Sequence, residues 1–160
     1  MIQPKDSPEQ SRIGKEFYES SAYFEGQAAS HLNDYESSFQ RYRIRKVLGL
    51  YTPGLDDRVV DLGCGWGTFG FALSETVGEV LGIDFSGQAI ELCNERLKAD
   101  PRPNLSFRRA DAADTGLTTA STDLVIAADL FEHVYPEDTL RIVREAHRIL
   151  KPGGRLSVWT

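Results

Sequence analysis

The sequence predicts an α/β domain built on a doubly wound parallel sheet. Two observations support this. After Gly54, short apolar runs alternate with stretches of helical periodicity, an alternation that is typical of parallel strands joined by helices. The run at 122–128 is almost entirely apolar, as expected of a strand covered by helices on both faces. The 160 residues suit a single domain.

The first part of the chain is predicted to be helical. Ser7 can cap a helix, with Pro8 in its first turn and Gln10 placed for a capping box. We expect residues 1–35 to form a helical cap or lid, and the remaining 36–160 to form the sheet domain. A further helix is expected over 34–51, with a stripe formed by Ile44, Val47, Leu48 and Tyr51.

The following segments alternate as the fold class requires. Pro53-Gly54 ends the early helical region. The predicted strands are 58–63, 79–86, 105–110, 122–128 and 155–160. The predicted helices are 69–76, one that Ser86 caps with Ile90, Cys93 and Leu97 on its buried face, and 136–150 with Ile142, Val143, Ala146, Ile149 and Leu150 directed inward.

Composition and charge limit the classes of partner. The net charge of −6 would repel a phosphate backbone, so we expect no nucleic-acid partner. No apolar run approaches the roughly 20 residues of a membrane span, and the N-terminus lacks a secretory pattern, so a cytoplasmic protein is expected. The basic run Arg41–Lys46 is interpreted as a solvated helix face.

The stretch 61–70, "DLGCGWGTFG", can be interpreted in two ways. Gly65, Gly67 and Gly70 spell the Gly-x-Gly-x-x-Gly of a dinucleotide-binding turn, whereas Asp61 begins an Asp-x-Gly-x-Gly-x-Gly pattern. In either case glycines let a ligand approach the backbone closely. Asp84, which closes the next strand, suits a ribose diol under both interpretations.

Asp61 distinguishes the two. A carboxylate here would oppose the pyrophosphate of a nicotinamide dinucleotide but would favour a ligand with an ammonium group. S-adenosylmethionine has such a group and no phosphate. The alternative is a structural Asp61 that caps the turn through backbone N–H groups.

Five segments together resemble the class I S-adenosylmethionine-dependent methyltransferases: "VVDLGCGWGTFG", "VLGIDFS", "RRADAAD", "DLVIAADLFEHV" and "ILKPGGRLSV". The branch they resemble most is the small-molecule one that includes quinone-biosynthesis enzymes. The resemblance covers about 36–160. It implies a Rossmann-like sheet of order 3-2-1-4-5, with helices on both faces, and transfer of a methyl group to a small-molecule acceptor by in-line displacement.

The resemblance also implies roles for particular residues. Asp61 and Gly63 would hold the methionine amino group, with Cys64 and Gly65 in the same turn. Asp84 would bind the ribose and Phe85 would flank the adenine. The remaining contacts implied are Asp111 to the exocyclic amine, Ala112 through its backbone, and Asp129 beside both methyl donor and acceptor.

The candidate catalytic residues are Asp129, Glu132 and His133, which form an Asp-x-x-Glu-His pattern. Asp129 is not followed by the Pro-Pro-aromatic element of nucleic-acid N-methyltransferases, which also disfavours that acceptor class. His133 could act as a general base, or the three could hold a divalent metal. A structural role is the third interpretation, and we predict no metal.

The family's sixth and seventh strands have no counterpart up to Thr160, so a chain truncated after the fifth strand is expected. The alternatives to a methyltransferase are a nicotinamide-dependent oxidoreductase and a non-catalytic S-adenosylmethionine-binding domain. The first would need a catalytic Ser/Tyr/Lys or His constellation, which the sequence does not offer. Neither the acceptor nor the oligomeric state follows from the sequence.

Overall fold

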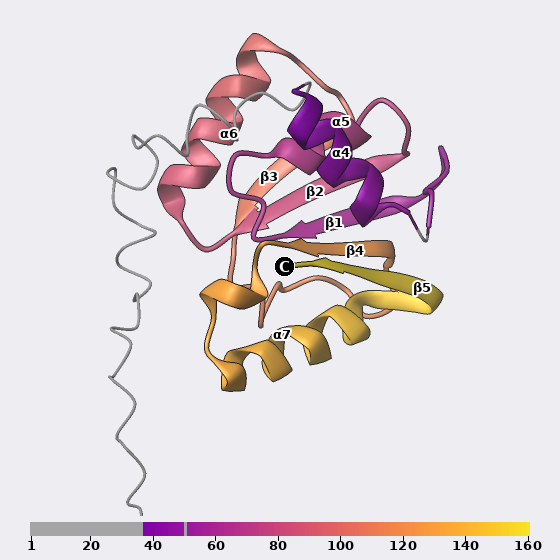
Figure 1. Cartoon of the computed structure of the whole chain (residues 1–160), viewed down its shortest axis with the longest axis vertical. Helices are drawn as coiled ribbons and strands as arrows, with labels where there is room; N and C mark the ends of the chain where they lie inside the picture. The colour runs from indigo at the N-terminus through magenta and orange to yellow at the C-terminus, as the bar shows by residue number, and fades with distance from the viewer. Residues whose placement is uncertain (1–36, 50) are drawn as a thin grey trace, which may run out of the picture.

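The computed structural model describes residues 37–49 and 51–160, and its centre is one parallel sheet (Figure 1). The strands lie in the order β3-β2-β1-β4-β5, which confirms the predicted order. Their bounds are Arg58–Leu62 for β1, Glu79–Asp84 for β2, Leu105–Arg109 for β3, Thr122–Ala128 for β4 and Leu150–Trp159 for β5. The predicted cap at 1–35 lies outside the described residues.

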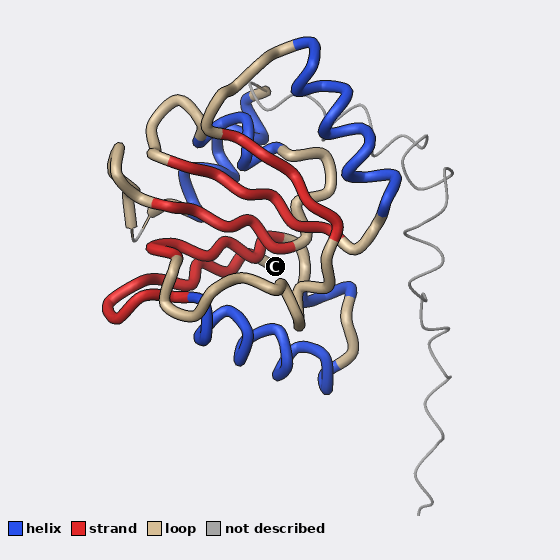
Figure 2. The backbone as a smooth tube through the Cα atoms, turned by 180° about the vertical axis from the view of Figure 1, so that it is seen from behind, coloured by secondary structure: helices blue, strands red, loops and turns tan. Residues whose placement is uncertain are grey.

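Helices cover both faces of the sheet (Figures 1 and 2). One face carries α4 (Ser38–Val47), α5 (Thr68–Leu73) and α6 (Gly87–Ala99), and the other carries α7 (Pro136–Ile149). A short 3₁₀ helix, η1 (Phe131–His133), joins β4 to α7. Side chains alternate along the strands between two apolar cores, so that neighbouring residues such as Val59 and Val60 belong to opposite faces.

Local sequence signals account for the helix starts. The Ser86 hydroxyl accepts a hydrogen bond from the Ala89 N–H at 3.3 Å, as predicted. Ser37 caps α4 in the same way, accepting from the Gln40 N–H at 3.2 Å. In α7, Ile142, Ala146 and Ile149 are buried, but Val143 is 37% exposed. The inward orientation predicted for Val143 is therefore wrong, because it lies one position off the i, i+4, i+7 stripe.

The fifth strand begins earlier than predicted. Leu150 already pairs with Thr122, and pairing resumes at Arg155 opposite Leu124 after a register shift. The residues between them, 151–154, contain Gly153 at φ 84°. The segment 151–154, expected to separate the predicted helix 136–150 from the strand 155–160, is thus an irregularity within β5, and the regular ladder follows it.

One aromatic ring packs against three glycines under the β1–α5 connection. A β-carbon built at Gly67, Gly70 or Gly82 would lie 2.8, 3.2 or 2.5 Å from the ring of Phe107 on β3. At Gly67 and Gly82 these separations leave no room for a side chain unless the ring moves, and at Gly70 the nearest atom is Leu105 Cδ1 at 2.9 Å. The glycines thus let α5 pack closely against β2 and β3.

Candidate active site

Two adjoining cavities open at the carboxyl ends of the strands, where connections from β1 and β4 diverge. This is where open α/β sheets bind ligands. The first cavity is lined by Gly63, Gly65, Ile83, Asp84, Phe85, Ser86, Ala110, Asp111, Ala112, Asp129, Leu130, His133, Val134, Tyr135, Asp138 and Ile142. The second is lined by Arg43, Asp61, Gly63, Cys64, Gly65, Trp66, Thr68, Phe69, Ala128, Asp129 and His133.

The glycine turn borders both cavities, because Gly63 and Gly65 line each of them. Gly63, Gly65 and Gly67 have φ of 72°, 48° and 73°, a region that side chains rarely adopt. The Gly63 N–H donates to the Ile83 carbonyl at 2.8 Å, which holds the turn over β2. A β-carbon at Gly65 would meet no atom within 4 Å. Gly65 therefore faces open cavity space, as a residue beside a ligand should.

Asp84 at the end of β2 holds the glycine turn from below. Its Oδ2 accepts from the Gly65 N–H and its Oδ1 from the Ser86 N–H, both at 2.9 Å. Burial raises the pKa of Asp84, and the N–H donors of Ser86, Gly65 and Phe85 oppose that rise. Each oxygen keeps a lone pair for a further donor, such as a ribose hydroxyl.

Asp61 is buried without such support. Its side chain is 2% exposed, and Oδ2 has no hydrogen-bond partner among the described residues. Burial raises its pKa to about 7; Arg43 opposes the rise, and the carboxylates of Asp84 and Asp129 add to it. An aspartate that capped the turn would have its oxygens occupied by N–H groups. The unpartnered Oδ2 instead suits a ligand that brings a donor.

Arg43 on α4 is a correction to the sequence analysis. Arg41, Arg45 and Lys46 are exposed as the solvated-face interpretation requires, but Arg43 is only 7% exposed. Its guanidinium forms an ion pair with Asp129 and lies over the Phe69 ring, 4.8 Å from the centroid. It therefore belongs to the wall of the second cavity.

The residues predicted to contact adenine line the first cavity. Phe85, Asp111 and Ala112 come from the loops after β2 and β3, which end side by side. The Asp111 Oδ1 accepts from the Ala113 N–H at 2.8 Å, which shapes this loop. Cys64 lines only the second cavity, and its thiol pKa is raised by a hydrogen bond with Cys93 and by burial.

The three candidate catalytic residues are placed differently. Asp129 and His133 line both cavities, whereas Glu132 is exposed and lines neither. Asp129 adopts φ 53°, and its N–H donates to the Trp159 carbonyl at 2.7 Å. Within 37–49 and 51–160, no group of three or more His, Cys, Asp or Glu side chains is placed to hold a metal ion. The metal interpretation of this trio gains no support.

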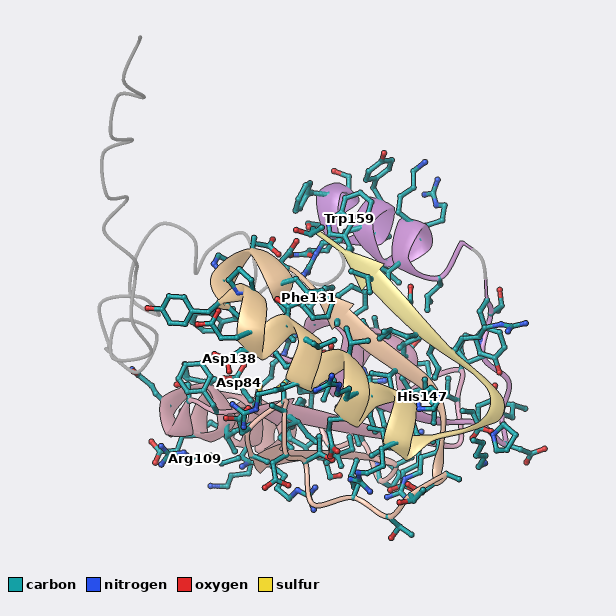
Figure 3. The ribbon with its side chains drawn as sticks, turned by 90° about the horizontal axis from the view of Figure 1, so that it is seen from below. Asp84, Arg109, Phe131, Asp138, His147 and Trp159 are labelled. Atoms are coloured by element: carbon teal, nitrogen blue, oxygen red, sulfur yellow. The ribbon has the colours of Figure 1, made fainter. Side chains whose placement is uncertain are left out.

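Several residues that line the first cavity were not predicted from the sequence as site residues. The segment after β4 contributes Leu130, Tyr135, Asp138 and Ile142 to the first cavity. Figure 3 shows Asp138, from the start of α7, on the same side of the molecule as Asp84. Their position after the end of β4 was the available signal, because every loop at this edge of the sheet borders the ligand crevice.

Comparison with known proteins decides between the two interpretations of the glycine turn. Residues 59–154, more than half of the chain, match the family described as "Methyltransferase domain". The chain belongs to the class I S-adenosylmethionine-dependent methyltransferases. The methyl donor of this family is S-adenosylmethionine, which favours the interpretation that begins at Asp61.

Individual relatives agree on the family and differ in acceptor. A demethylmenaquinone methyltransferase of Lactococcus lactis is 35% identical over 61% of this chain and 39% of its own length. A ribosomal RNA large subunit methyltransferase G of Streptomyces avermitilis is 38% identical over 64% of this chain and 28% of its own. A Haemonchus contortus phosphoethanolamine N-methyltransferase, solved with S-adenosylhomocysteine, shares the fold at TM-score 0.73 and 23% identity, covering 89% of this chain and 30% of its own.

This methyltransferase chain spans about half the length of its curated relatives or less. The comparisons thus establish the family and the fold. No helix in the described part of the chain is both long and apolar enough to cross a membrane.

Proposed function

We propose that this protein binds S-adenosylmethionine in the two joined cavities and transfers its methyl group to a small-molecule acceptor. The observation that carries the proposal is Asp61, whose buried Oδ2 has no partner among the described residues and lies beside a glycine turn open at Gly65. A buried carboxylate oxygen without a donor is costly, and a cationic ligand group would remove that cost.

The lining of the cavities fits the parts of the cofactor in order. The second cavity offers Asp61 to the ammonium group, and the first offers Asp84 to the ribose. The first cavity offers Phe85 and Leu130 as apolar walls, with Asp111 as an acceptor, which suits adenine. When bound, the cofactor would supply a methyl group already activated by its sulfonium.

The chain's own residues would then provide alignment, since much of the catalysis of such a displacement is proximity. Asp129 and His133 line both cavities, which supports a role for them beside the acceptor. His133 would serve as general base where the acceptor must lose a proton. Glu132, which is exposed, would act on neither group directly.

A small-molecule acceptor is supported by the net charge of −6 and by the quinone-type relative. The ribosomal RNA relative supplies the competing acceptor class, and it is the reason to include RNA in any activity assay. A cytoplasmic location remains a prediction from the sequence. The second candidate function is a non-catalytic cofactor-binding domain. It is supported by the chain's coverage of only about half or less of the length of its curated relatives.

The test is calorimetric titration of the 160-residue chain with S-adenosylhomocysteine and, as a control, with NAD. We expect saturable binding of the first and none of the second. Binding of NAD alone would overturn the assignment of the site. Absence of binding for both would overturn the proposal for this chain.

A further inference from the structure

The connection between β3 and β4 contains residues assigned to adenine, yet it has no helix or extended strand of its own. Residues 110–121 contain only an isolated bridge between Asp111 and Asp114. Ala110, Asp111 and Ala112, at the start of this loop, line the first cavity. Since no regular element supports the loop, its conformation depends on the side chains that hold it from outside.

Glu145 on α7 holds the middle of the loop. The Thr115 N–H donates to Glu145 Oε1 at 2.8 Å, and the Thr115 hydroxyl donates to the same oxygen. Glu145 is 8% exposed and Thr115 is 2% exposed, so water competes little for these bonds. The Thr115 carbonyl accepts from Arg108 on β3. Thr115 is therefore held through its N–H, its hydroxyl and its carbonyl.

Arg148, one turn later on α7, keeps Glu145 ionised and in place. Its Nε donates to Glu145 Oε2 and its Nη2 to Oε1, both at 2.7 Å, which makes a bidentate ion pair. These bonds, together with the Thr115 donors, lower the pKa of Glu145 to about 2 against the opposing effect of burial. Arg148 also donates to the Thr119 hydroxyl at 3.1 Å, so the ion pair reaches a second point of the loop.

Thr115 is linked to Asp111 through a tight turn. The Asp114 N–H donates to the Asp111 carbonyl at 2.9 Å, and the Ala113 N–H donates to Asp111 Oδ1 at 2.8 Å. The turn closed by these bonds begins at Asp111 and ends directly before Thr115. A shift of Thr115 would therefore move the turn, and the Asp111 carboxylate with it.

Helix α7 thus contributes to the first cavity in two ways. Ile142 lines the cavity directly, whereas Glu145, one turn later, lines neither cavity. Ile142 also packs in one apolar core with Ala112 and Ala113 of the loop. Glu145 can therefore influence a bound ligand only through the loop that it holds.

We propose that Glu145 is a positioning residue for base recognition: it holds the β3–β4 loop so that Asp111 faces the exocyclic amine of the cofactor's adenine. This inference rests on the proposed function. It gives α7 a role in cofactor selectivity through a side chain that touches no ligand. A residue that merely stabilised the fold would change the free energy of unfolding and leave the choice of base unaltered.

The test measures selectivity between two bases. S-adenosylhomocysteine and S-inosylhomocysteine, which has a carbonyl oxygen where adenine has its exocyclic amine, are titrated into the unmodified chain, Glu145→Ala and Asp111→Ala. Each titration is made at a temperature at which the variant is folded, as measured by thermal unfolding.

The unmodified chain should prefer the adenine ligand by about 10-fold or more, because the carbonyl oxygen of the other ligand would face a carboxylate. Both variants should reduce this preference to within about threefold. Combining Glu145→Ala with Asp111→Ala should lower the preference no further than Asp111→Ala alone, since both substitutions act on the same contact.

Thr115 supplies a second, milder pair of variants. Thr115→Val removes the hydroxyl that donates to Glu145 and should lower the preference, whereas Thr115→Ser keeps the hydroxyl and should retain it. If Glu145→Ala does not fold, this pair decides the question. Asp123→Ala is the control for stability, since Asp123 binds the Arg58 N–H and Lys151 and lines neither cavity. It should unfold more easily and keep the full preference for adenine.

The outcomes separate this inference from the proposed function. A folded Glu145→Ala with the preference of the unmodified chain would leave Glu145 a purely structural role and overturn the inference, with the proposed function intact. Equal binding of the two ligands by the unmodified chain would also overturn it, because Asp111 would then not distinguish the bases. If the unmodified chain binds neither ligand, the proposed function and this inference both fail.

Discussion

Asp84 and Asp61 are buried carboxylates at the ends of neighbouring strands, yet they differ in their hydrogen bonds. Asp84 receives backbone N–H groups on both oxygens, whereas Asp61 has an oxygen with no partner among the described residues. The difference is in what each residue stabilises before a ligand arrives. Asp84 organises the glycine turn from within the protein, and Asp61 keeps an oxygen that can still accept a hydrogen bond from a ligand.

The contrast extends to the two cavities. The first is shaped by loops whose polar groups bond to their own backbone, such as Asp111 to Ala113. The second contains Asp61 and Arg43, two buried side chains that each have an atom without a hydrogen-bond partner among the described residues. In the first cavity the polar side chains are held by hydrogen bonds within the protein, whereas in the second two charged side chains still lack a hydrogen bond. A charged ligand would therefore gain most of its binding free energy in the second cavity.

The largest effect on ligand binding is expected from Gly65→Val, because Gly65 lines both cavities and a valine side chain would obstruct them. A side chain at Gly65 would project into open cavity space at a φ of 48°. Binding of S-adenosylhomocysteine should be lost, by more than about 100-fold, while the fold survives a strain of about 1–3 kcal/mol. Calorimetry and thermal unfolding measure the two quantities.

Gly116→Val is the matched control, since Gly116 also has positive φ and open space around it but lines neither cavity. It should carry a similar backbone strain and leave affinity unchanged. Equal affinities for the two valine variants would show that Gly65 does not border the ligand.

Asp84→Ala should have the next largest effect. It removes an acceptor for the ribose and also leaves the Gly65 and Ser86 N–H groups without their partner. We expect binding of S-adenosylhomocysteine to weaken by roughly 1–3 kcal/mol, with a loss of unfolding free energy of similar size. Calorimetry and chemical denaturation report on each separately.

Asp123→Ala provides the comparison for the structural part of this effect. Asp123 lies on β4 and lines neither cavity. It accepts a hydrogen bond from the Arg58 N–H at 2.9 Å and another from the Lys151 ammonium group. It should lower stability without changing affinity. An Asp84→Ala variant that lost stability alone, with normal affinity, would contradict the ribose assignment.

The smallest expected effect is a pH dependence that belongs to Asp61. Its pKa of about 7 lies above the ordinary 3.8, chiefly because of burial. The folded state therefore holds a proton between pH ~4 and ~7 that the unfolded state has released, so the contribution of Asp61 to unfolding free energy falls as pH rises through that window. A ligand ammonium needs the carboxylate, so apparent affinity should fall by up to about tenfold per pH unit below 7.

Titrations between pH 5.5 and 7.5 in buffers of different ionisation enthalpy would measure this proton release. Asp61→Asn should abolish the pH dependence, bind more weakly at pH 7.5, and raise the unfolding temperature there, because the amide carries no buried charge. A flat profile shared by the unmodified chain and Asp61→Asn would show that no ammonium group meets this residue.

Features with local causes were predictable from the sequence. The largely apolar run 122–128 is β4 with the predicted bounds, and Ser86 caps α6 as its sequence position indicates. Asp61, Asp84 and Asp111 lie at or just after the ends of β1, β2 and β3, so their position along one edge of the sheet was predictable. Such features need only a few neighbouring residues to be recognised.

Features that depend on distant partners were not predictable. Arg43 has the same local surroundings as Arg45, and its burial comes from Asp129, 86 positions further along the chain. Gly67 and Gly70 fit a nucleotide fingerprint in sequence, but both are required by the packing of Phe107. Their spacing therefore carried no information about the ligand, whereas the unpartnered Asp61 did.

The ring of Phe107 also constrains how this domain can evolve. It lies 2.8 Å from the β-carbon position of Gly67 and 2.5 Å from that of Gly82, so a side chain at either glycine would require the ring to move. A smaller residue at 107 would relieve these two contacts at the cost of a void. Positions 82 and 107 are therefore expected to vary together across relatives.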